Sequence, residues 1–306
     1  AAEAPPAAAA EALAAVPGAA GLWEATWWDP QGHDETFAFI AKSCVKELSV
    51  QADNLQKRYK EQGPAGKFKP CVYVERMVVA AMPRGGGVLV YSPVPLTPEL
   101  EAAVKAKGGC KLLVLPSSEH ARHYRGWMEA FAEAVVVCPG GESMAPILKD
   151  LGDAAQVLDA NAKSKWSQAA VRALTGTNYE VLDAGGFQEL LIMLRSSKTL
   201  LTSDSIYLGS SDKKDPSGWK NFPEKEWSQL YFDVFCAKSP SLLPRYRHLL
   251  NEEQKKTVAK VMQKVIEWKP ERVTSARSGK TSEGEGKHGV DEAERILKGH
   301  WAWCWQ

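Results

Sequence analysis

The sequence lacks several features that would assign a class of protein at once. No run of about 18 apolar residues is present, so no segment is predicted to cross a bilayer. Lys and Arg total 38 and Asp and Glu total 37, which gives a formal net charge of +1. This balance argues against a nucleic-acid partner, which calls for a basic excess. The six cysteines form no Cys-x-x-Cys pair and are predicted to be buried apolar thiols.

The first 20 residues have a strongly biased composition. Twelve of them are Ala, and Pro5, Pro6 and Pro17 interrupt any helical run. Such a tail buries too little apolar surface to order itself, so we expect order there only where a packing contact or a partner holds it. The Ala-Ala-Glu start also looks like what remains after a targeting peptide has been removed.

A long amphipathic helix is predicted over residues 34–62. Asp34 is a suitable N-cap, apolar residues recur at steps of three and four, and Gly63-Pro64 ends the run. The apolar face docks either on its own domain or on a neighbouring protein. We therefore divide the chain into an N-terminal segment, residues 1–69, and one domain, residues 70–306.

The second segment alternates strands with helices, which indicates an α/β domain. Strands are predicted over residues 71–80, 88–91, 111–115, 134–138, 179–182, 189–194 and 199–203. Helices are predicted over residues 97–107, 124–132 and 251–268. No internal repeat is present.

Four short motifs resemble a known family in their order and spacing. They are LVYSPVPLTPEL at 89–100, LLVLP at 112–116 followed by Glu119-His120, RSSKTLLTSD at 195–204, and VIEWKPERV at 265–273. This set resembles the domain of unknown function 4336 family, a divergent metallo-β-lactamase-like branch, over about residues 70 to 300. The resemblance implies an αββα sandwich, here with an N-terminal helical extension. Plant and algal members of the branch are plastid proteins, which suits the processed-looking start.

The resemblance also locates the metal motif of working metallo-β-lactamase-like hydrolases. Their His-x-His-x-Asp-His motif falls on residues 118–123, where Ser118 replaces the first His and Arg122 replaces the Asp, while His120 and His123 remain. The bridging Asp of the family matches Asp204. The histidine expected near residues 183–186 is missing.

The final His-Gly of the family reads Arg277-Ser278 in this chain. A dinuclear centre gathers carboxylates and neutral imidazoles around about four positive charges, whereas Arg is always protonated. Arg122 and Arg277 therefore oppose metal binding, and we expect Arg122 to pair with Asp204 or Glu119. The alternatives are an intact dinuclear centre, one metal on His120, His123 and Asp204, or polar residues left in an inactive pocket.

Other patterns favour no chemistry. Residues 139–143 (PGGES) lack the phosphate-binding pattern and indicate a turn, and no Gly-x-Ser-x-Gly elbow is present. No cofactor is expected.

The C-terminus carries three alternating tryptophans, Trp301, Trp303 and Trp305, after an amphipathic helix that starts near Asp291. This helix packs on the sandwich, or the tryptophans anchor it in a partner or at a membrane boundary.

Together these features predict a non-catalytic accessory or structural subunit of a plastid protein assembly, with a thylakoid photosynthetic complex as the expected setting. Protein subunits are the expected partners, and contact with a membrane surface is an alternative. The rival hypothesis is a hydrolase of an ester, thioester or phosphoester that uses one metal. A third hypothesis is a small-molecule binder that kept a pocket but lost the chemistry.

Overall fold

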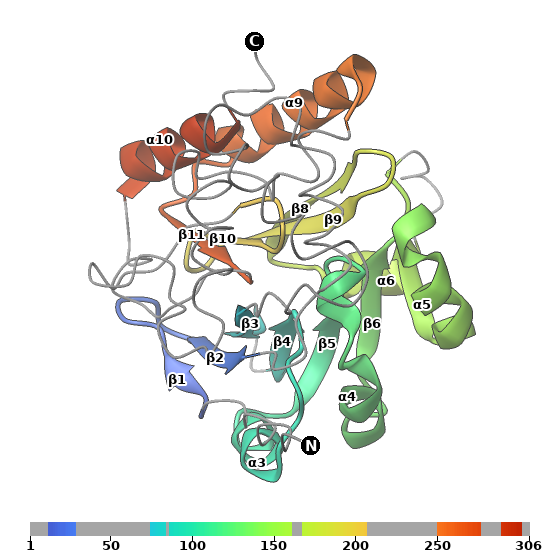
Figure 1. The fold of residues 1–306 in the computed structure, drawn as a ribbon. Helices are drawn as coiled ribbons and strands as arrows, with labels where there is room; N and C mark the ends of the chain where they lie inside the picture. Colours follow the sequence, from blue (N-terminus) through green and yellow to red (C-terminus); the bar gives the residue numbers. More distant parts are fainter. Residues whose placement is uncertain are drawn as a thin grey trace, which may run out of the picture.

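Two β-sheets lie face to face, and helices cover their outer sides (Figure 1). The computed structural model describes residues 12–28, 74–83, 86–160, 167–206, 250–276 and 289–301. Within these residues the layers follow the order helix, sheet, sheet, helix. The predicted αββα sandwich is therefore confirmed.

The larger sheet has the strand order β1-β2-β3-β4-β5-β6-β7. Its strands are β1 (Ala14–Ala15), β2 (Leu22–Trp28), β3 (Val74–Ala81), β4 (Val88–Tyr91), β5 (Cys110–Val114), β6 (Val135–Pro139) and β7 (Ala155–Leu158). The first four strands pair antiparallel, whereas β4 to β7 run parallel. The parallel half is apolar along nearly its whole length, as expected where both faces of a sheet are covered.

The smaller sheet has the strand order β11-β10-β9-β8. Its strands are β8 (Thr177–Asp183), β9 (Gln188–Leu194), β10 (Thr199–Thr202) and β11 (Arg272–Ser275). β8, β9 and β10 pair antiparallel in turn, and β10 pairs with β11 in parallel. The C-terminal ends of β10 and β11 therefore lie together at one edge of this sheet.

Helices complete the two outer layers. On the larger sheet these are α3 (Pro98–Lys105), α4 (Tyr124–Ala130) and α5 (Ala145–Leu151), while α6 (Gln168–Ala173) packs beside β6 and β7. α9 (Glu252–Glu267) and α10 (Gly289–Trp301) lie over the smaller sheet (Figure 1). Short turns of 3₁₀ helix occur at Glu119–Ala121, Glu142–Met144 and Gly152–Ala154.

The helices begin where the sequence supplies caps. The side chain of Thr97 accepts a hydrogen bond from the backbone N–H of Leu100, and Pro98 occupies the first turn of α3. In α9, Asn251 and Gln254 form a reciprocal capping box, and each bond satisfies a backbone N–H that the helix leaves unpaired. Local sequence therefore sets the start of both helices.

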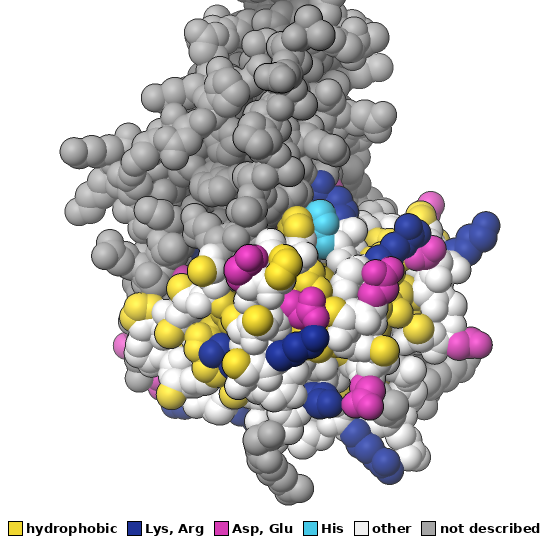
Figure 2. Space-filling model, turned by 90° about the horizontal axis from the view of Figure 1, so that it is seen from below, with side chains coloured by type: hydrophobic (Ala, Val, Ile, Leu, Met, Phe, Trp, Pro, Cys, Tyr) yellow, Lys and Arg dark blue, Asp and Glu magenta, His cyan; other side chains and the backbone are white. Residues whose placement is uncertain are grey.

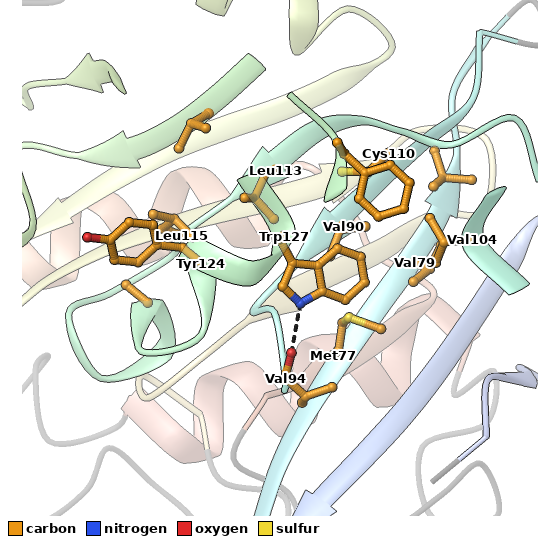
Figure 3. Packing of buried hydrophobic residues seen from close by; sticks show 14 of the residues in the cluster. Met77, Val79, Val90, Val94, Val104, Cys110, Leu113, Leu115, Tyr124 and Trp127 are labelled. Carbon is orange, nitrogen blue, oxygen red and sulfur yellow. Dashed lines mark hydrogen bonds between the residues drawn. The ribbon is translucent and has the colours of Figure 1, made fainter. Parts of the chain in front are cut away.

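The outer core, which lies between the larger sheet and helices α3, α4 and α5, is built around Trp127. Its ring stacks near Phe131 with centroids 5.7 Å apart, and its Nε1 donates to the carbonyl of Val94 at 2.7 Å (Figure 3). Met77 and Val79 of β3 contribute from the sheet. The indole is fully buried yet has its N–H satisfied, so its burial carries no polar cost.

The core between the sheets is lined by inward-facing residues of both. Leu112 and Val114 of β5 lie opposite Leu190 and Ile192 of β9 in one buried cluster. Tyr91 adds a polar connection, since its hydroxyl donates to the carbonyl of Leu190 at 2.9 Å. This bond ties the last residue of β4 to the opposite sheet.

The predicted N-terminal segment contributes to the sandwich. β2 pairs with β3 from Leu22 to Trp28, and Leu22 lies in the core between the sheets. Glu24 is buried because Arg76 on β3 lies beside it, with Arg76 Nε 3.8 Å from Glu24 Oε2. No strand was predicted there from the sequence. Residues 29–69, with the predicted helix over 34–62, lie outside the described residues.

The remaining strands and helices predicted from sequence are confirmed within one to three residues at most ends. Cys110 and Cys138 are buried free thiols, as predicted, and burial raises the pKa of each to about 12. In α10, Ala293 and Leu297 are buried, which agrees with packing on the sandwich. Trp303 and Trp305 lie outside the described residues, and the side chain of Trp301 is not described.

None of the helices in the described part of the chain combines the length and apolar character that crossing a membrane requires. Figure 2 shows the face seen from below, where acidic and basic side chains are scattered among apolar ones. Charges of one sign do not gather on this face, in keeping with the balanced composition.

Candidate functional site

The candidate site lies where strands of both sheets end. Ser92 directly follows β4, Ser117 follows β5, and Asp204 follows β10. His120 sits in the 3₁₀ turn Glu119–Ala121. The backbone N–H of Leu190 donates to the carbonyl of Pro116 at 2.8 Å, which holds the two sheets together beside these residues.

His120 is held between two polar groups. Its Nδ1 lies 2.7 Å from Ser92 Oγ, and its Nε2 lies 3.4 Å from Asp204 Oδ1. The side chains of His120 and Asp204 are both 0% exposed. The structure therefore brings together two of the three predicted metal-ligand candidates and adds Ser92, which the sequence analysis did not single out.

Ser92 adopts a backbone conformation that few side-chain-bearing residues adopt. Its φ is 58°, in the left-handed region, and its N–H donates to the carbonyl of Val114 at 3.1 Å. This turn directs the hydroxyl of Ser92 toward His120. Backbone strain is thus present at the residue that contacts the imidazole.

Asp204 is positioned by a hydrogen bond to its own carboxylate and by bonds that hold its two neighbours in the chain. Ser117 Oγ donates to Asp204 Oδ2 at 3.0 Å. On either side of Asp204, the backbone N–H groups of Ser203 and Ser205 donate to the two carboxylate oxygens of Glu189, each at 2.7 Å, and Ser205 Oγ adds a third bond at 2.7 Å. Glu189 therefore clamps the turn that carries Asp204.

Glu189 is the main residue of the site that sequence reasoning missed. Its pKa is raised to about 7, chiefly by burial and also by the charge of Asp204, against the hydrogen bonds from Ser203 and Ser205, which lower it. The available signal was one acid within the otherwise apolar strand QELLIML. Burial, and then the charges of Glu189 and Asp204, raise the pKa of Tyr91 well above its ordinary value.

Arg122 and His123 both contact Glu75, at the start of β3. Arg122 Nη2 forms a close ion pair with Glu75 Oε1, and His123 Nε2 lies 3.8 Å from Glu75 Oε2. The Glu75 side chain is 2% exposed and that of Arg122 is 29% exposed. Arg122 Nε also donates to the backbone carbonyl of Glu119 at 3.2 Å.

Arg122 was expected to pair with Asp204 or Glu119. The structure instead pairs its guanidinium with the carboxylate of Glu75, and Arg122 contacts Glu119 through the backbone carbonyl. The reason is that antiparallel β3 begins at the same end of the sheet where β4 and β5 finish, so Glu75 reaches the turn that carries Arg122. Ser118 precedes that turn and makes no capping bond with its side chain.

A dinuclear metal centre does not fit this arrangement. Among the described residues, no three His, Cys, Asp or Glu side chains form a group that could hold an ion. The guanidinium of Arg122, next to these residues, faces the carboxylate of Glu75. Arg277 lies outside the described residues. The remaining donor pair is His120 and Asp204.

The predicted turn at residues 139–143 is a turn in the structure. Gly141 has φ 131°, and a Cβ there would lie 2.4 Å from the Gln188 side chain, so glycine permits this approach. The N–H and the hydroxyl of Ser143 both donate to Gln188 Oε1, at 3.1 and 2.6 Å. The segment thus serves to join α5 to β9.

Comparison with known proteins gives similarity of fold only. No protein-family model and no curated protein matches the chain. Among solved structures, a metal-soaked Flv1 flavodiiron core from Synechocystis sp. has a TM-score of 0.45 at 10% identity, covering 98% of this chain and 62% of its own, so the chain spans less than two thirds of that protein.

Two metallo-β-lactamases are also similar. DIM-1 has a TM-score of 0.38 at 11% identity, covering 95% of this chain and 99% of its own. FIM-1 from Pseudomonas aeruginosa, in a mono-zinc form, has a TM-score of 0.43 at 9% identity. The match covers 94% of this chain and 96% of FIM-1. The metallo-β-lactamase-like αββα sandwich is the architecture that the two sheets and their helical layers form here.

Proposed function

We propose that this chain is a non-catalytic accessory or structural subunit of a plastid protein assembly, with a thylakoid photosynthetic complex as the expected setting. The proposal rests on one observation, the ion pair between Arg122 and Glu75. A permanent cation stands where the resembled hydrolases keep an acidic ligand, and a buried carboxylate neutralises it.

The neighbouring contacts support the same conclusion. His120 and Asp204 are closed off from solvent and contact each other, while His123 contacts Glu75. A metal-dependent hydrolase needs donors that converge on an ion with one open position for water. The described side chains instead direct the two histidines toward different acids.

Elemental analysis of the purified protein tests the loss of the metal centre. We expect less than about 0.1 zinc or iron per chain after incubation with either ion and desalting, since the donor set lacks a third ligand. The matched variant is Arg122→Asp, which restores the acidic residue type. Stoichiometric metal in the wild-type protein would overturn the proposal.

Isolation from plastids tests the role in an assembly. A tagged chain is purified from detergent-treated plastids under native conditions and sized by gel filtration. We expect it to elute with other subunits in reproducible proportion. A chain that elutes as a monomer of 33.5 kDa would contradict the assembly role even if it binds no metal.

A hydrolase that uses one metal is the second candidate, and one distance favours it. His120 Nε2 lies 3.4 Å from Asp204 Oδ1, close to the spacing of two ligands that are each about 2.0–2.1 Å from a tetrahedral zinc ion. The substrate would be an ester, thioester or phosphoester. Metal retained by the wild-type protein and lost in His120→Ala, together with hydrolysis lost in the same variant, would favour this candidate over the first.

A further inference from the structure

Arg272, the first residue of β11, places a buried guanidinium between the two sheets. It is 1% exposed. Arg272 pairs with Thr199 of β10, which pairs with Leu194 of the core between the sheets, so these side chains share one face. The guanidinium reaches the turn between β1 and β2, where it contacts the carbonyl of Pro17. Because β10 and β11 run parallel, Arg272 lies at the opposite end of these strands from Asp204 and is separate from the candidate site.

The hydrogen bonds of this guanidinium are few and long. Nη1 donates to Thr199 Oγ1 and Nη2 to the carbonyl of Pro17, each at 3.4 Å, whereas N–H to oxygen bonds usually span about 2.7–3.2 Å. Nε is buried and has no hydrogen-bond partner among the described residues. Thr274, two positions further along the same face of β11, also has a buried hydroxyl that meets no partner in the described part of the chain. Buried donors on this face therefore lack strong acceptors.

The charge of Arg272 is not neutralised by an ion pair within the described ranges. Glu271, its neighbour in sequence, bonds to Lys198 Nζ at 2.7 Å, and Glu24 of the opposite sheet lies beside Arg76. Burial lowers the pKa of Arg272, and the charge of Glu271 only partly opposes this. An arginine nevertheless stays protonated near neutral pH, and an uncompensated buried charge is strongly destabilising. The fold therefore calls for an anion that its described acids do not supply.

The surroundings favour a very small anion. Gly18 has φ 68°, and a Cβ there would lie 3.6 Å from Arg272 Nη2, so glycine leaves this side of the guanidinium without a side chain. Val16 and Leu22, on either side of the turn, belong to the apolar core between the sheets. A peptide or a lipid head group cannot reach a residue that is closed off in this way. Apolar walls also favour a monovalent ion, because the cost of removing water rises with charge.

We propose that Arg272 binds one chloride-sized halide ion, held by its Nε and Nη groups and by the hydroxyl of Thr274. The ion neutralises the guanidinium and joins β11 to the turn at Pro17 and Gly18. Hydrogen bonds to an anion are shorter and stronger than those to a neutral carbonyl, so the ion adds charge-assisted contacts where the protein provides only long ones. The site is independent of the metal-type residues and goes beyond the proposed function.

Urea unfolding of the full chain in sodium chloride and in sodium gluconate, at equal ionic strength, tests the requirement for a halide. Gluconate is too large to enter a closed site, so it controls for general salt effects. For a Kd of about 10 mM, chloride at about 200 mM is expected to raise the folding equilibrium constant about 20-fold over gluconate, because the ion binds only the folded state. A rise of less than about twofold would overturn the proposal.

Two arginine variants locate the effect. Arg272→Met removes the charge and keeps an apolar side chain of similar length, so it is expected to abolish the difference between the two salts. In gluconate it should be at least as stable as the wild-type protein, since no uncompensated charge remains. Arg195→Met is the matched control, because Arg195 is exposed and its Nε donates to Asn178 Oδ1 at 2.7 Å. It is expected to keep the full chloride response. An equal response in Arg272→Met and wild type would indicate a general salt effect and refute the site.

Crystals of the wild-type protein grown in sodium bromide locate the ion directly, whether or not Arg272→Met folds. We expect an anomalous-scattering peak within hydrogen-bonding distance of both Arg272 Nε and Thr274 Oγ1, and its absence at saturating bromide would overturn the assignment. Thr274→Val, which removes only the hydroxyl, is expected to weaken the affinity for chloride about fivefold. Unchanged affinity in this variant would contradict the proposed set of donors.

Discussion

Arg122 pairs with Glu75, a residue 47 positions earlier in the chain. Arg122 follows the 3₁₀ turn that carries His120, whereas Glu75 lies on β3, on the far side of β4 from that turn. The pair therefore fastens the turn after β5 to another part of the larger sheet. In this chain a buried carboxylate on β3 therefore neutralises the cation beside His120 and His123.

Replacing Glu75 with Gln tests how much this pair stabilises the fold. Glu75 is almost fully buried, whereas the side chain of Arg122 is 29% exposed. In the variant the guanidinium therefore loses its acidic partner but is partly hydrated. We expect the free energy of unfolding to fall by about 2 kcal/mol, below the 3–5 kcal/mol typical of fully buried pairs. Urea unfolding of Glu75→Gln, Arg122→Met and the double variant gives the coupling energy. Strictly additive losses would show that the two residues do not interact.

The clamp formed by Glu189 predicts a pH dependence of stability. The pKa of its carboxyl is raised from 4.5 to about 7 in the folded protein, so the folded state keeps its proton where the unfolded chain has lost it. Below pH 4.5 both states are protonated and no penalty applies. As pH rises from 4.5 to about 7, stability from this group is lost, on the order of 3 kcal/mol in total.

Glu189→Gln checks this assignment. The variant loses one acceptor to Ser205 and is less stable overall. Its free energy of unfolding is nevertheless expected to change less between pH 5 and pH 8 than that of the wild-type protein, by about 2 kcal/mol, because part of the total loss already occurs below pH 5. Glu101→Gln is the control, because Glu101 is on the surface of α3 and pairs only locally with Lys105. An identical pH dependence in wild type and Glu189→Gln would refute the clamp as its source.

The sequence predicts the elements whose signals are local. α9 has an apolar stripe and its own capping residues, and β5 is an apolar run between turns, so both can be read without knowledge of their neighbours. β2 was missed because its burial depends on pairing with β3, which is distant in sequence. The charge of Glu24 also suggests exposure until Arg76 is placed beside it.

The candidate site, too, was predicted only in part from the sequence. The motif resemblance placed His120 and Asp204 in one site, and the structure brings them together. It did not identify Ser92, Glu189 or Glu75, because each acts through a partner contributed by another strand or turn. Side chains of this kind have no signature in sequence spacing, since the contact arises only when the two sheets or the ends of different strands meet.

Trp127 gives a test of the outer core. Trp127→Phe removes part of a fully buried ring and the hydrogen bond to the carbonyl of Val94, so that acceptor is left buried. We expect a loss of about 2–3 kcal/mol in the free energy of unfolding, and about 4–5 kcal/mol for Trp127→Ala. Chemical denaturation followed by circular dichroism measures both. A loss below about 0.5 kcal/mol for Trp127→Ala, the level of a surface change, would show that this cluster is not packed as described.

The backbone at Ser92 can be tested with a pair of substitutions. Ser92→Ala and Ser92→Gly both remove the hydroxyl that contacts His120 Nδ1, so each loses that hydrogen bond. Only glycine adopts φ 58° without steric cost. We therefore expect Ser92→Gly to be more stable than Ser92→Ala by about 1 kcal/mol, although glycine usually destabilises a chain relative to alanine. Urea denaturation of the two variants side by side measures the difference. If alanine proves the more stable, Ser92 does not occupy the left-handed region in solution, and the bond that directs it toward His120 is not formed as described.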